Sequence, residues 1–322
     1  MNVRVQQFVV AVAIVLFILK LIAYYLTQSV AILTDALEST VNVIAGFISL
    51  YSLSVAAKPK DEDHPYGHGK AEFLSAAVEG SMIVLAGFII IYEAINNLIH
   101  PHEITKLDYG IFLVAVSGII NFGVGLFSVS KGKKNNSMAL VAGGRHLQSD
   151  AYSTIGLLVG LGLIYYLHLQ WIDSAVAIIF SFIIIFTGYR ILRSSVAGIM
   201  DEADRDLLVK MISHINSNRS ENWIDLHNLR VIKYGGVLHL DCHLTVPWYI
   251  NVKEAHSEIE KLSQIIRTQF GESLEIFVHS DPCLDFSCSI CTKKECTERM
   301  RPFEKKVPWT WDNTVQDKKH QL

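Results

Sequence analysis

The sequence has little net charge. Its 28 Lys and Arg residues nearly balance 31 Asp and Glu residues, which leaves a formal net charge of −3. This balance favours neither a nucleic-acid partner nor an acidic one. The sequence also lacks a repeat of solenoid period, and no small-residue cleavage site follows its N-terminal apolar run. We therefore expect no nucleic-acid partner, no repeat architecture and no cleaved signal peptide.

Apolar residues, in contrast, are abundant and come in long runs. Hydrophobic residues make up 51% of the chain and the mean hydropathy is +0.32, which is too apolar for an ordinary soluble domain. A bilayer core of about 30 Å needs about 20 apolar residues in a helix. The sequence therefore predicts a polytopic α-helical membrane protein in a lipid bilayer, with six transmembrane helices: Gln7 to Leu26, Ala31 to Leu53, Phe73 to Ile95, Tyr109 to Val129, Ser137 to Tyr166, and Ile172 to Leu192.

Positive charges predict the orientation of these helices. The connections after the second and fourth helices and the end of the sixth helix are basic, whereas the other loops carry only Lys106. Cytoplasmic loops are enriched in Lys and Arg, so both termini are expected in the cytoplasm. The basic residues are Lys58, Lys60, Lys70, Lys131, Lys133, Lys134, Arg190 and Arg193.

From Asp201 the composition changes to that of a soluble domain. A helical pattern leads to two alternating stretches joined at Gly235-Gly236, which predicts a hairpin, and then to a second helix and a last strand. This order predicts a small cytoplasmic α+β domain. The expected domains are 1–200 in the membrane, 201–282 as the α+β domain, and 283–322 as a Cys-rich, then polar, extended tail. The predicted elements are helices 205–217 and 252–270 and strands 226–233, 237–246 and 274–279.

Two polar stripes interrupt the predicted membrane helices. His146 and Asp150 are spaced i, i+4, so they project from one side of the fifth helix, and Asp35, Glu38 and Asn42 share one stripe of the second. Such groups are costly in a membrane unless they bind a ligand, pair or carry protons. If the stripes face each other, their oxygen and nitrogen atoms suit a divalent transition metal; otherwise they pack against other helices or lie near the interface.

Histidines recur in the parts expected outside the membrane. The loop Asp61-Glu62-Asp63-His64-Pro65-Tyr66-Gly67-His68-Gly69-Lys70 either ligates a metal at the cytoplasmic mouth or is simply solvated. In the strand 237–246, side chains of His239, Asp241 and His243 share one face because side chains alternate with period two. This density favours metal binding over purely structural histidines, and the residues concerned are His227, His239, His243, His256, His279 and Asp281.

Four of the five cysteines crowd into 14 residues of the tail. They are spaced Cys283-x4-Cys288-x2-Cys291-x4-Cys296. In the cytoplasm, reduced thiols or a metal are expected rather than disulfides. A closed thiolate site for zinc or another soft ion is favoured, while an iron–sulfur cluster and a redox-active or merely reduced cluster remain alternatives.

Taken together, these motifs resemble the cation diffusion facilitator family, which consists of dimeric divalent-metal/proton antiporters. The resemblance implies six transmembrane helices and a ferredoxin-like, metallochaperone-like cytoplasmic domain, and it extends from about Phe8 to Cys283. The motifs that carry it are the stretch Ser29 to Ser39, the loop His64 to Lys70, the stretch His146 to Asp150, Asp173 at the start of the sixth helix, Met200-Asp201, and the stretch His279 to Cys283.

The resemblance implies a transport site of Glu38, Asn42, His146 and Asp150. The family more often has Asp or His at the position of Glu38 and Asp at that of Asn42, so the choice among zinc, manganese, iron and cobalt stays open. Asp35 matches a family residue that is not usually a ligand, and a compensating role for it at this site stays open. Further implied sites are a loop site of Asp61, His64 and His68, a binuclear site of His227, His243, His256, His279 and Asp281, and a dimer-holding charge pair of Lys70 and Asp201.

The expected function is therefore transport rather than enzymatic catalysis. A homodimer in the plasma (inner) membrane would export divalent metal from the cytoplasm by alternating access, in exchange for protons, with metal also acting as a regulator. Imidazole and carboxylate bind metal only when deprotonated, so protons can drive metal release. The alternative is a membrane-anchored metal sensor or buffer whose departures at Glu38 and Asn42 impair transport.

Overall fold

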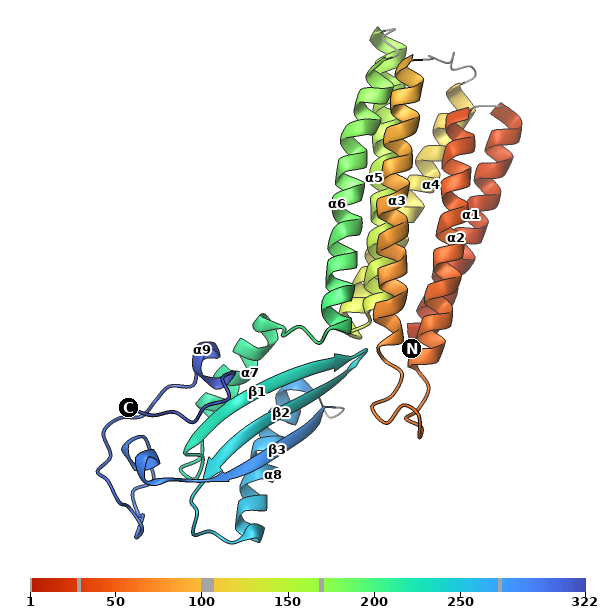
Figure 1. Cartoon of the computed structure of the whole chain (residues 1–322). Coiled ribbons are helices and arrows are strands. Elements are labelled where there is room, and N and C mark those ends of the chain that lie inside the picture. The colour runs from red at the N-terminus through yellow and green to blue at the C-terminus, as the bar shows by residue number, and fades with distance from the viewer. Residues whose placement is uncertain (1, 28–29, 100–106, 168–170, 272–273) are drawn as a thin grey trace. The chain divides into compact units, whose positions relative to one another are not determined.

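The computed structural model describes residues 2–27, 30–99, 107–167, 171–271 and 274–322. Within these ranges some helical side chains, including those of residues 30–38, lie outside the description. The chain forms two compact units, Met1–Met200 and Asp201–Leu322. Figure 1 labels the helices and strands of each unit.

The first unit is built from six long helices of 26 to 30 residues. At about 1.5 Å per residue they are about 39 to 45 Å long, enough to cross a bilayer. Over the described residues, α1, α3, α4 and α6 qualify as spans by length and composition. The predicted class of polytopic α-helical membrane protein is confirmed. The helices are α1 (Asn2–Thr27), α2 (Val30–Ala56), α3 (Ala71–Ile99), α4 (Leu107–Lys134), α5 (Met138–Leu167) and α6 (Trp171–Ile199).

Helix α5 lies at the centre of this bundle, where it packs against α2, α3, α4 and α6 (Figure 1). Small residues allow its close approach to α4. A Cβ atom added to Gly144 of α5 would lie 2.8 Å from the Gly125 carbonyl oxygen and 2.8 Å from the Val129 backbone nitrogen of α4. Interfaces between membrane helices commonly use small residues in this way. This contact holds α5 against α4 at the helical turn of α5 that also carries His146.

Replacing Gly144 with alanine should therefore destabilise the helical unit by about 1 to 3 kcal/mol, the usual cost of overpacking. The added methyl group would meet backbone atoms that cannot rotate away. Thermal unfolding of the detergent-solubilised protein measures the effect. Gly123→Ala is the matched control, because a Cβ atom there meets no atom within 4 Å. Equal unfolding temperatures for the two variants would contradict the close contact.

The second unit begins with the helix α7 (Arg205–Ser217) and continues through β1 (Asp225–Tyr234), β2 (Val237–Val246), α8 (Val252–Phe270) and β3 (Glu275–Pro282). The strands form a sheet in the order β1-β2-β3 (Figure 1). β1 and β2 are antiparallel and joined at the predicted hairpin, where Gly235 has a φ of 59°. β2 and β3 are parallel, and α8 provides the crossover connection that parallel strands need. The predicted α+β domain is confirmed.

The hydrophobic core of this unit lies between the two long helices and one face of the sheet. Alternate β2 residues Leu240, Cys242 and Leu244 are at most 2% exposed and pack with residues from α7 and α8. Since side chains in a strand alternate between faces, the intervening His239, Asp241 and His243 point to the other side. The sheet therefore presents its histidines on the face opposite the core.

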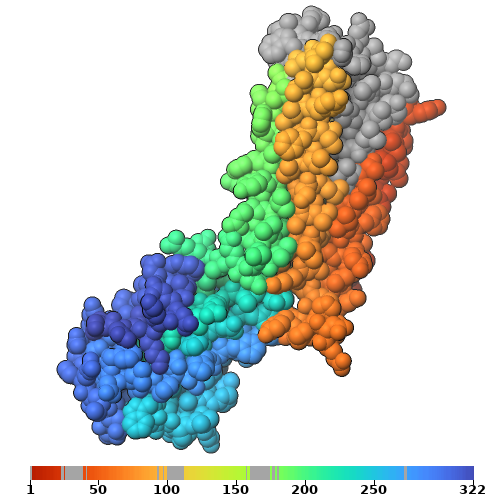
Figure 2. Space-filling model, viewed as in Figure 1, coloured from red at the N-terminus to blue at the C-terminus, as the bar shows by residue number. Residues whose placement is uncertain are grey.

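The residues after Cys283 do not form the extended tail that the sequence predicts. A short 3-10 helix η1 (Asp285–Ser289) and the helix α9 (Trp311–Thr314) belong to the sheet-containing unit. Trp309 is 3% exposed and lies in the main core. In the space-filling view the C-terminal residues, drawn in blue, lie directly against the rest of the unit (Figure 2). The polar composition concealed a few large apolar residues that anchor the segment by burial.

Candidate metal sites

The stripes of α2 and α5 meet inside the helical bundle. The Asn42 side-chain amide donates a hydrogen bond to Asp150 Oδ2, and His146 Nδ1 lies 3.5 Å from Asp150 Oδ1. The three residues are 6 to 7% exposed. Their positions follow from helix geometry, since i, i+4 spacing stacks His146 and Asp150 on one side of α5. Two helices therefore converge on one carboxylate.

The donor atoms at this point are suited to a cation. Asn42 Oδ1 is buried and accepts no hydrogen bond from the described residues. An amide oxygen, a carboxylate and an imidazole can all coordinate a divalent ion. The structure thus brings together Asn42, His146 and Asp150 of the predicted four-residue site. The side chains of Glu38, its fourth member, and of Asp35 and Asp173 lie outside the described part of the chain.

A carboxylate that we did not identify from the sequence lies next to this site. Glu79 of α3 is 1% exposed, and its Oε2 has no hydrogen-bond partner among the described residues. A Cβ atom on Gly143 of α5 would lie 3.6 Å from Glu79 Oε1, and Gly143 precedes His146 by three residues on the helix. A buried carboxylate beside an imidazole-bearing helix is a candidate for binding or proton transfer. The available signal was an acidic residue inside the apolar run Phe73 to Ile95, which contains two, Glu79 and Glu93.

The loop between α2 and α3 forms a second cluster. Asp61 Oδ1 lies 3.0 Å from His64 Nδ1, and Asp61 Oδ2 lies 3.3 Å from His68 Nε2. One ligand atom of each residue lies within 4.8 Å of the others, as metal binding requires. Desolvation would raise the pKa of Asp61, but hydrogen bonds from His64 and the charges of both histidines outweigh it and lower the pKa. The predicted loop residues are therefore close enough to share an ion.

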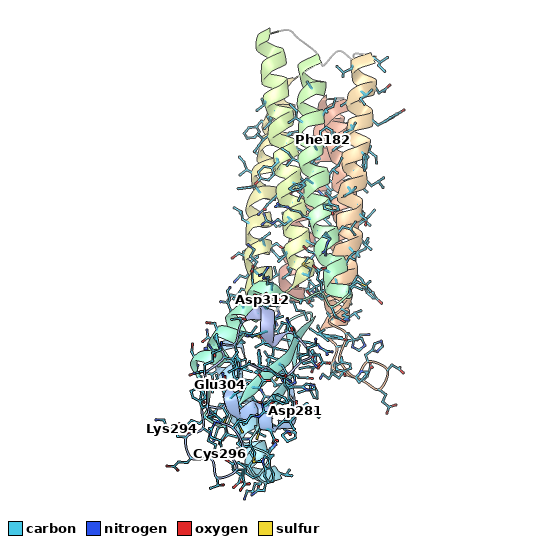
Figure 3. All side chains as sticks on the ribbon, turned by 60° about the vertical axis from the view of Figure 1, so that its left-hand side comes forward. Phe182, Asp281, Lys294, Cys296, Glu304 and Asp312 are labelled. Carbon is cyan, nitrogen blue, oxygen red and sulfur yellow. The ribbon has the colours of Figure 1, made fainter. Side chains whose placement is uncertain are left out.

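The third cluster is a row of histidines across the sheet. The strand register pairs His227 of β1 with His243 of β2, and His243 with His279 of β3. His227 Nε2 lies 3.4 Å from Asp281 Oδ2, and His243 Nδ1 lies 3.3 Å from the same oxygen. His279 Nε2 lies 3.5 Å from Asp281 Oδ1. Asp281, labelled in Figure 3, is therefore the carboxylate on which three imidazoles converge.

C-terminal residues contact the carboxylate that pairs with one histidine of this row. Asp225 Oδ2 lies 3.2 Å from His227 Nδ1, and Asp225 also binds the His320 ring and accepts a 3.0 Å hydrogen bond from its backbone N–H. Burial alone would raise the pKa of Asp225, but these hydrogen bonds hold it well below its usual range. A charged carboxylate behind a histidine orients the ring and increases its basicity as a ligand. Lys319 lies 3.8 Å from Asp281 Oδ1.

Two of the histidines predicted as metal ligands lie outside the row. His256 on α8 has a 70% exposed side chain whose nearest acidic partner is Glu260, at 3.9 Å. His239 pairs with Glu275 across the sheet, where its Nδ1 lies 3.2 Å from Glu275 Oε2. The sequence therefore predicted more metal-binding histidines in this unit than the structure brings together at Asp281. Asp225, His320 and Lys319 were not predicted, because their contacts come from a folded tail.

Lys70 and Asp201 belong to different units. Lys70 Nζ lies 3.5 Å from the Ile199 carbonyl oxygen at the end of α6. Asp201 follows α6 with a φ of 56°, a left-handed conformation that is uncommon outside glycine. The role of these two residues as a charge pair stays a prediction.

The tail cysteines line one pocket of the second unit, where Figure 3 labels Cys296. All of them are free thiols. Burial raises the pKa of the Cys283 thiol, and the negative charge of neighbouring thiolates adds to this effect. The spacing of the cysteines in the sequence did not show that they share a pocket. The cysteines that line the pocket are Cys283, Cys288, Cys291 and Cys296.

Comparison with known protein families covers both units. Residues 7–200 match the transmembrane domain of cation efflux proteins. Residues 204–283 match the cytoplasmic domain of cation efflux proteins. The two matches follow each other in the same order as the two units of the structure.

Similar proteins span most of the same length. The chain is 32% identical to an uncharacterized transporter of Synechocystis over 267 residues, which are 83% of this chain and 86% of the relative. It is 29% identical to the manganese efflux system protein MneS of Bacillus subtilis, over 85% of this chain and 93% of the relative. It is 26% identical to the cation-efflux pump FieF of Shewanella oneidensis, over 85% of this chain and 91% of the relative. This integral membrane protein therefore belongs to the cation diffusion facilitator family of cation efflux transporters.

Proposed function

We propose that the protein exports a divalent transition metal from the cytoplasm in exchange for protons. The observation that carries this proposal is the buried meeting of Asn42, His146 and Asp150 between α2 and α5. Glu38 precedes Asn42 by one helical turn and completes the proposed ligand set. A site shared by two helices can be opened to either side when one helix moves against the other. Both chain termini lie in the cytoplasm in this proposal, and the membrane is the plasma (inner) membrane.

The coupling to protons follows from the ligands. His146 and Asp150 hold a metal only in their deprotonated states, so metal and protons compete for the same atoms. In the outward-facing state protons replace the metal, and in the inward-facing state cytoplasmic metal replaces the protons. Asn42 contributes an oxygen without a charge, which lowers the negative charge of the site relative to an all-carboxylate set.

The donor set favours manganese or iron over zinc as cargo. Glu38, Asn42 and Asp150 offer oxygen, and His146 offers the only nitrogen among the four proposed ligands. Oxygen ligands suit Mn²⁺, whereas sites richer in imidazole suit Zn²⁺ and its neighbours. The similarity to a manganese efflux protein of Bacillus subtilis supports the same choice. Cobalt and zinc are the weaker substrates in this proposal.

Uptake by proteoliposomes tests the function. Vesicles with an acidic interior are mixed with Mn²⁺, Fe²⁺, Co²⁺ or Zn²⁺, and metal in the lumen is measured with time. Uptake should be fastest for Mn²⁺ or Fe²⁺ and should slow when the pH gradient is removed. The competing function is a membrane-anchored sensor or buffer, which the additional clusters at Asp61 and Asp281 favour. Purified protein that binds metal while vesicles load none would support that alternative.

Glu79 is expected to carry protons in this exchange. Replacing it with glutamine keeps the shape of the side chain but removes its titration, so the pH dependence of uptake should become shallower while metal affinity at fixed pH is retained. Uptake rates over a pH series measure the effect. Glu79→Asp, which keeps a carboxyl group, is the matched control and should keep a pH dependence closer to that of the wild type. A wild-type pH profile for Glu79→Gln would exclude this role.

The cytoplasmic clusters are proposed to bind metal as a regulator of a homodimer. A metal that binds the folded state stabilises it by RT ln(1 + [L]/Kd), about 2.7 kcal/mol at 100 times Kd. The described ligands are His227, His243, His279 and Asp281, while His256 is exposed and can serve only where the domain meets another surface. Lys70 and Asp201 are proposed to hold the dimer at the membrane–cytoplasm junction.

Asp281→Asn should reduce the metal-dependent rise in unfolding temperature of the detergent-solubilised protein, because the other proposed metal sites are left intact. The substitution deletes the charge on which three imidazoles converge. Asp285→Asn, in η1 four residues further on, is the control and should keep the rise. The same metal-dependent rise in both variants would show that the row is not a metal site.

A further inference from the structure

The segment after Cys283 is a part of this chain that the family match does not cover, because the matched cytoplasmic domain ends at residue 283. It is nevertheless folded onto that domain. Ile290 and Cys291 are 1% and 6% exposed and pack with Ile224, which directly precedes β1. Trp309 lies further along in the main core, where the Arg219 guanidinium is 4.0 Å from its ring centroid. The segment therefore has fixed backbone positions from which side chains can form a site.

One arginine holds the loop that carries the cysteines. The Arg299 guanidinium donates hydrogen bonds to the carbonyl oxygens of Cys288 at 2.9 Å, Cys291 at 3.2 Å and Lys293 at 2.6 Å. The backbone also turns on itself, since the Cys291 N–H donates to the Cys288 carbonyl oxygen at 3.4 Å. A turn over Cys-x-x-Cys is the spacing that structural zinc sites use. Arg299 thus holds the loop through backbone carbonyl oxygens, and these hydrogen bonds do not involve the cysteine sulfur atoms.

The pocket that the thiols line is small. Its volume is about 20 Å³, and Trp248 and Tyr249 from the turn after β2 form part of its wall. A cavity needs about 10 to 15 Å³ by this measure to hold one water molecule. A single metal ion therefore fits in this space.

The charges around the pocket suit a negatively charged complex of a metal ion with thiolates. Lys293 and Arg299 line it, but both donate to neutral acceptors: Lys293 Nζ lies 2.8 Å from Asn222 Oδ1, and Arg299 binds backbone carbonyls. Four thiolates around a divalent ion carry a net charge of −2, which these two neighbouring cations would offset. Thiolates are soft ligands and select ions such as Zn²⁺ over Mn²⁺.

We propose that the four pocket cysteines form a closed thiolate site for one ion of the Zn²⁺ class. In the described part of the chain, the groups of three whose ligand atoms lie within 4.8 Å of one another are the Asp61 and Asp281 clusters. No three of the four described sulfur atoms lie within that distance of one another, so binding of one ion requires the cysteine side chains to rotate toward it. The ligands are Cys283, Cys288, Cys291 and Cys296.

This ion is structural and is not cargo. Four protein ligands leave no open coordination position for exchange, which distinguishes structural from catalytic zinc sites. Cys283 lies at the end of β3, two residues after Asp281, and its N–H donates to the Val246 carbonyl oxygen at 2.9 Å. The ion consequently fastens the C-terminal segment to the strand that carries the carboxylate of the histidine row.

Cobalt binding to the reduced full-length protein in detergent tests this site. Co²⁺ bound to thiolates gives charge-transfer absorption in the near ultraviolet, which histidine and carboxylate ligands do not give. The wild type should show this band, and Cys288→Ser/Cys291→Ser should lose it and bind one ion fewer per chain. Cys242→Ala is the control and should keep the band, because Cys242 is 2% exposed in the β2 core.

Two measurements separate loss of the site from loss of the fold. Cys291→His replaces one thiolate with an imidazole nitrogen, so it should retain the bound ion with a weaker charge-transfer band. In the presence of a chelator, the double serine variant should unfold at the same temperature as the chelator-treated wild type. The proposal is overturned if the reduced wild type shows no charge-transfer band, if the double variant keeps the wild-type band, or if the purified protein contains acid-labile sulfide, which indicates an iron–sulfur cluster instead.

Discussion

Replacing Asp150 with asparagine should abolish metal transport while the protein still folds. Asp150 is the carboxylate that both Asn42 and His146 contact, so the variant loses the charge at the centre of the site but keeps its shape. Loss of an outer-shell partner of a metal ligand typically costs about 10- to 100-fold in affinity or activity. Loss of a direct ligand should exceed that range. Initial uptake rates in proteoliposomes and metal affinity in detergent measure the two effects separately.

The same chemical change elsewhere in the chain provides the control. Asp206 is exposed in the first turn of α7, outside the helical unit, and Asp206→Asn should transport metal at the wild-type rate. Transport by Asp150→Asn within twofold of the control, roughly 0.4 kcal/mol by RT ln 2, would rule out Asp150 as a metal ligand.

Replacing Asn42 with aspartate should change both the metal preference and the proton coupling. The new carboxylate would face Asp150 at hydrogen-bond distance, and two carboxylates so close hold a proton between them when no cation is present. Metal binding should then release about one more proton than in the wild type, so metal affinity should rise more steeply with pH. The added charge should favour Zn²⁺ most, because Zn²⁺ stands above Mn²⁺ and Fe²⁺ in the Irving–Williams order.

Competition between Mn²⁺ and Zn²⁺ over a pH series measures this shift. Asn121→Asp is the matched control, since Asn121 is a buried asparagine of α4 at 4% exposure and is not one of the proposed ligands. It should leave the metal preference unchanged. An Asn42→Asp variant with the preference and pH slope of the wild type would show that residue 42 does not contact the ion.

Helix geometry explains how much of the membrane site the sequence predicts. The i, i+4 spacing of His146 and Asp150 holds in any α-helix, and the stripe ending at Asn42 needs only the same periodicity. Which stripes face each other depends on packing, and here α5 takes its central position partly through the close contact of Gly144 with Gly125. Glu79 was missed because its run stays predominantly apolar despite two carboxylates, Glu79 and Glu93. Its position opposite Gly143 follows from the packing of α3 and α5.

In the sheet, the sequence predicts which face a side chain occupies but not which residues pair across strands. The period of a strand correctly places His239 and His243 on one face, but it contains no information about register. The register pairs His243 with His227 and His279, while His239 pairs with Ile232 and Glu275. The alignment of β3 depends on how the connecting helix α8 packs, which short-range patterns do not specify. The folded tail was missed for a related reason, since a few buried residues such as Trp309 outweigh a polar average.

The central claim is that metal and protons exchange through the site at Asp150. The most direct test follows metal and pH together inside proteoliposomes that begin with no pH gradient. When Mn²⁺ or Fe²⁺ is added outside, metal should enter the lumen and the lumen should become alkaline at the same rate, and both signals should vanish in Asp150→Asn. Metal entry without a change in lumen pH, or undiminished exchange by Asp150→Asn, would contradict the account.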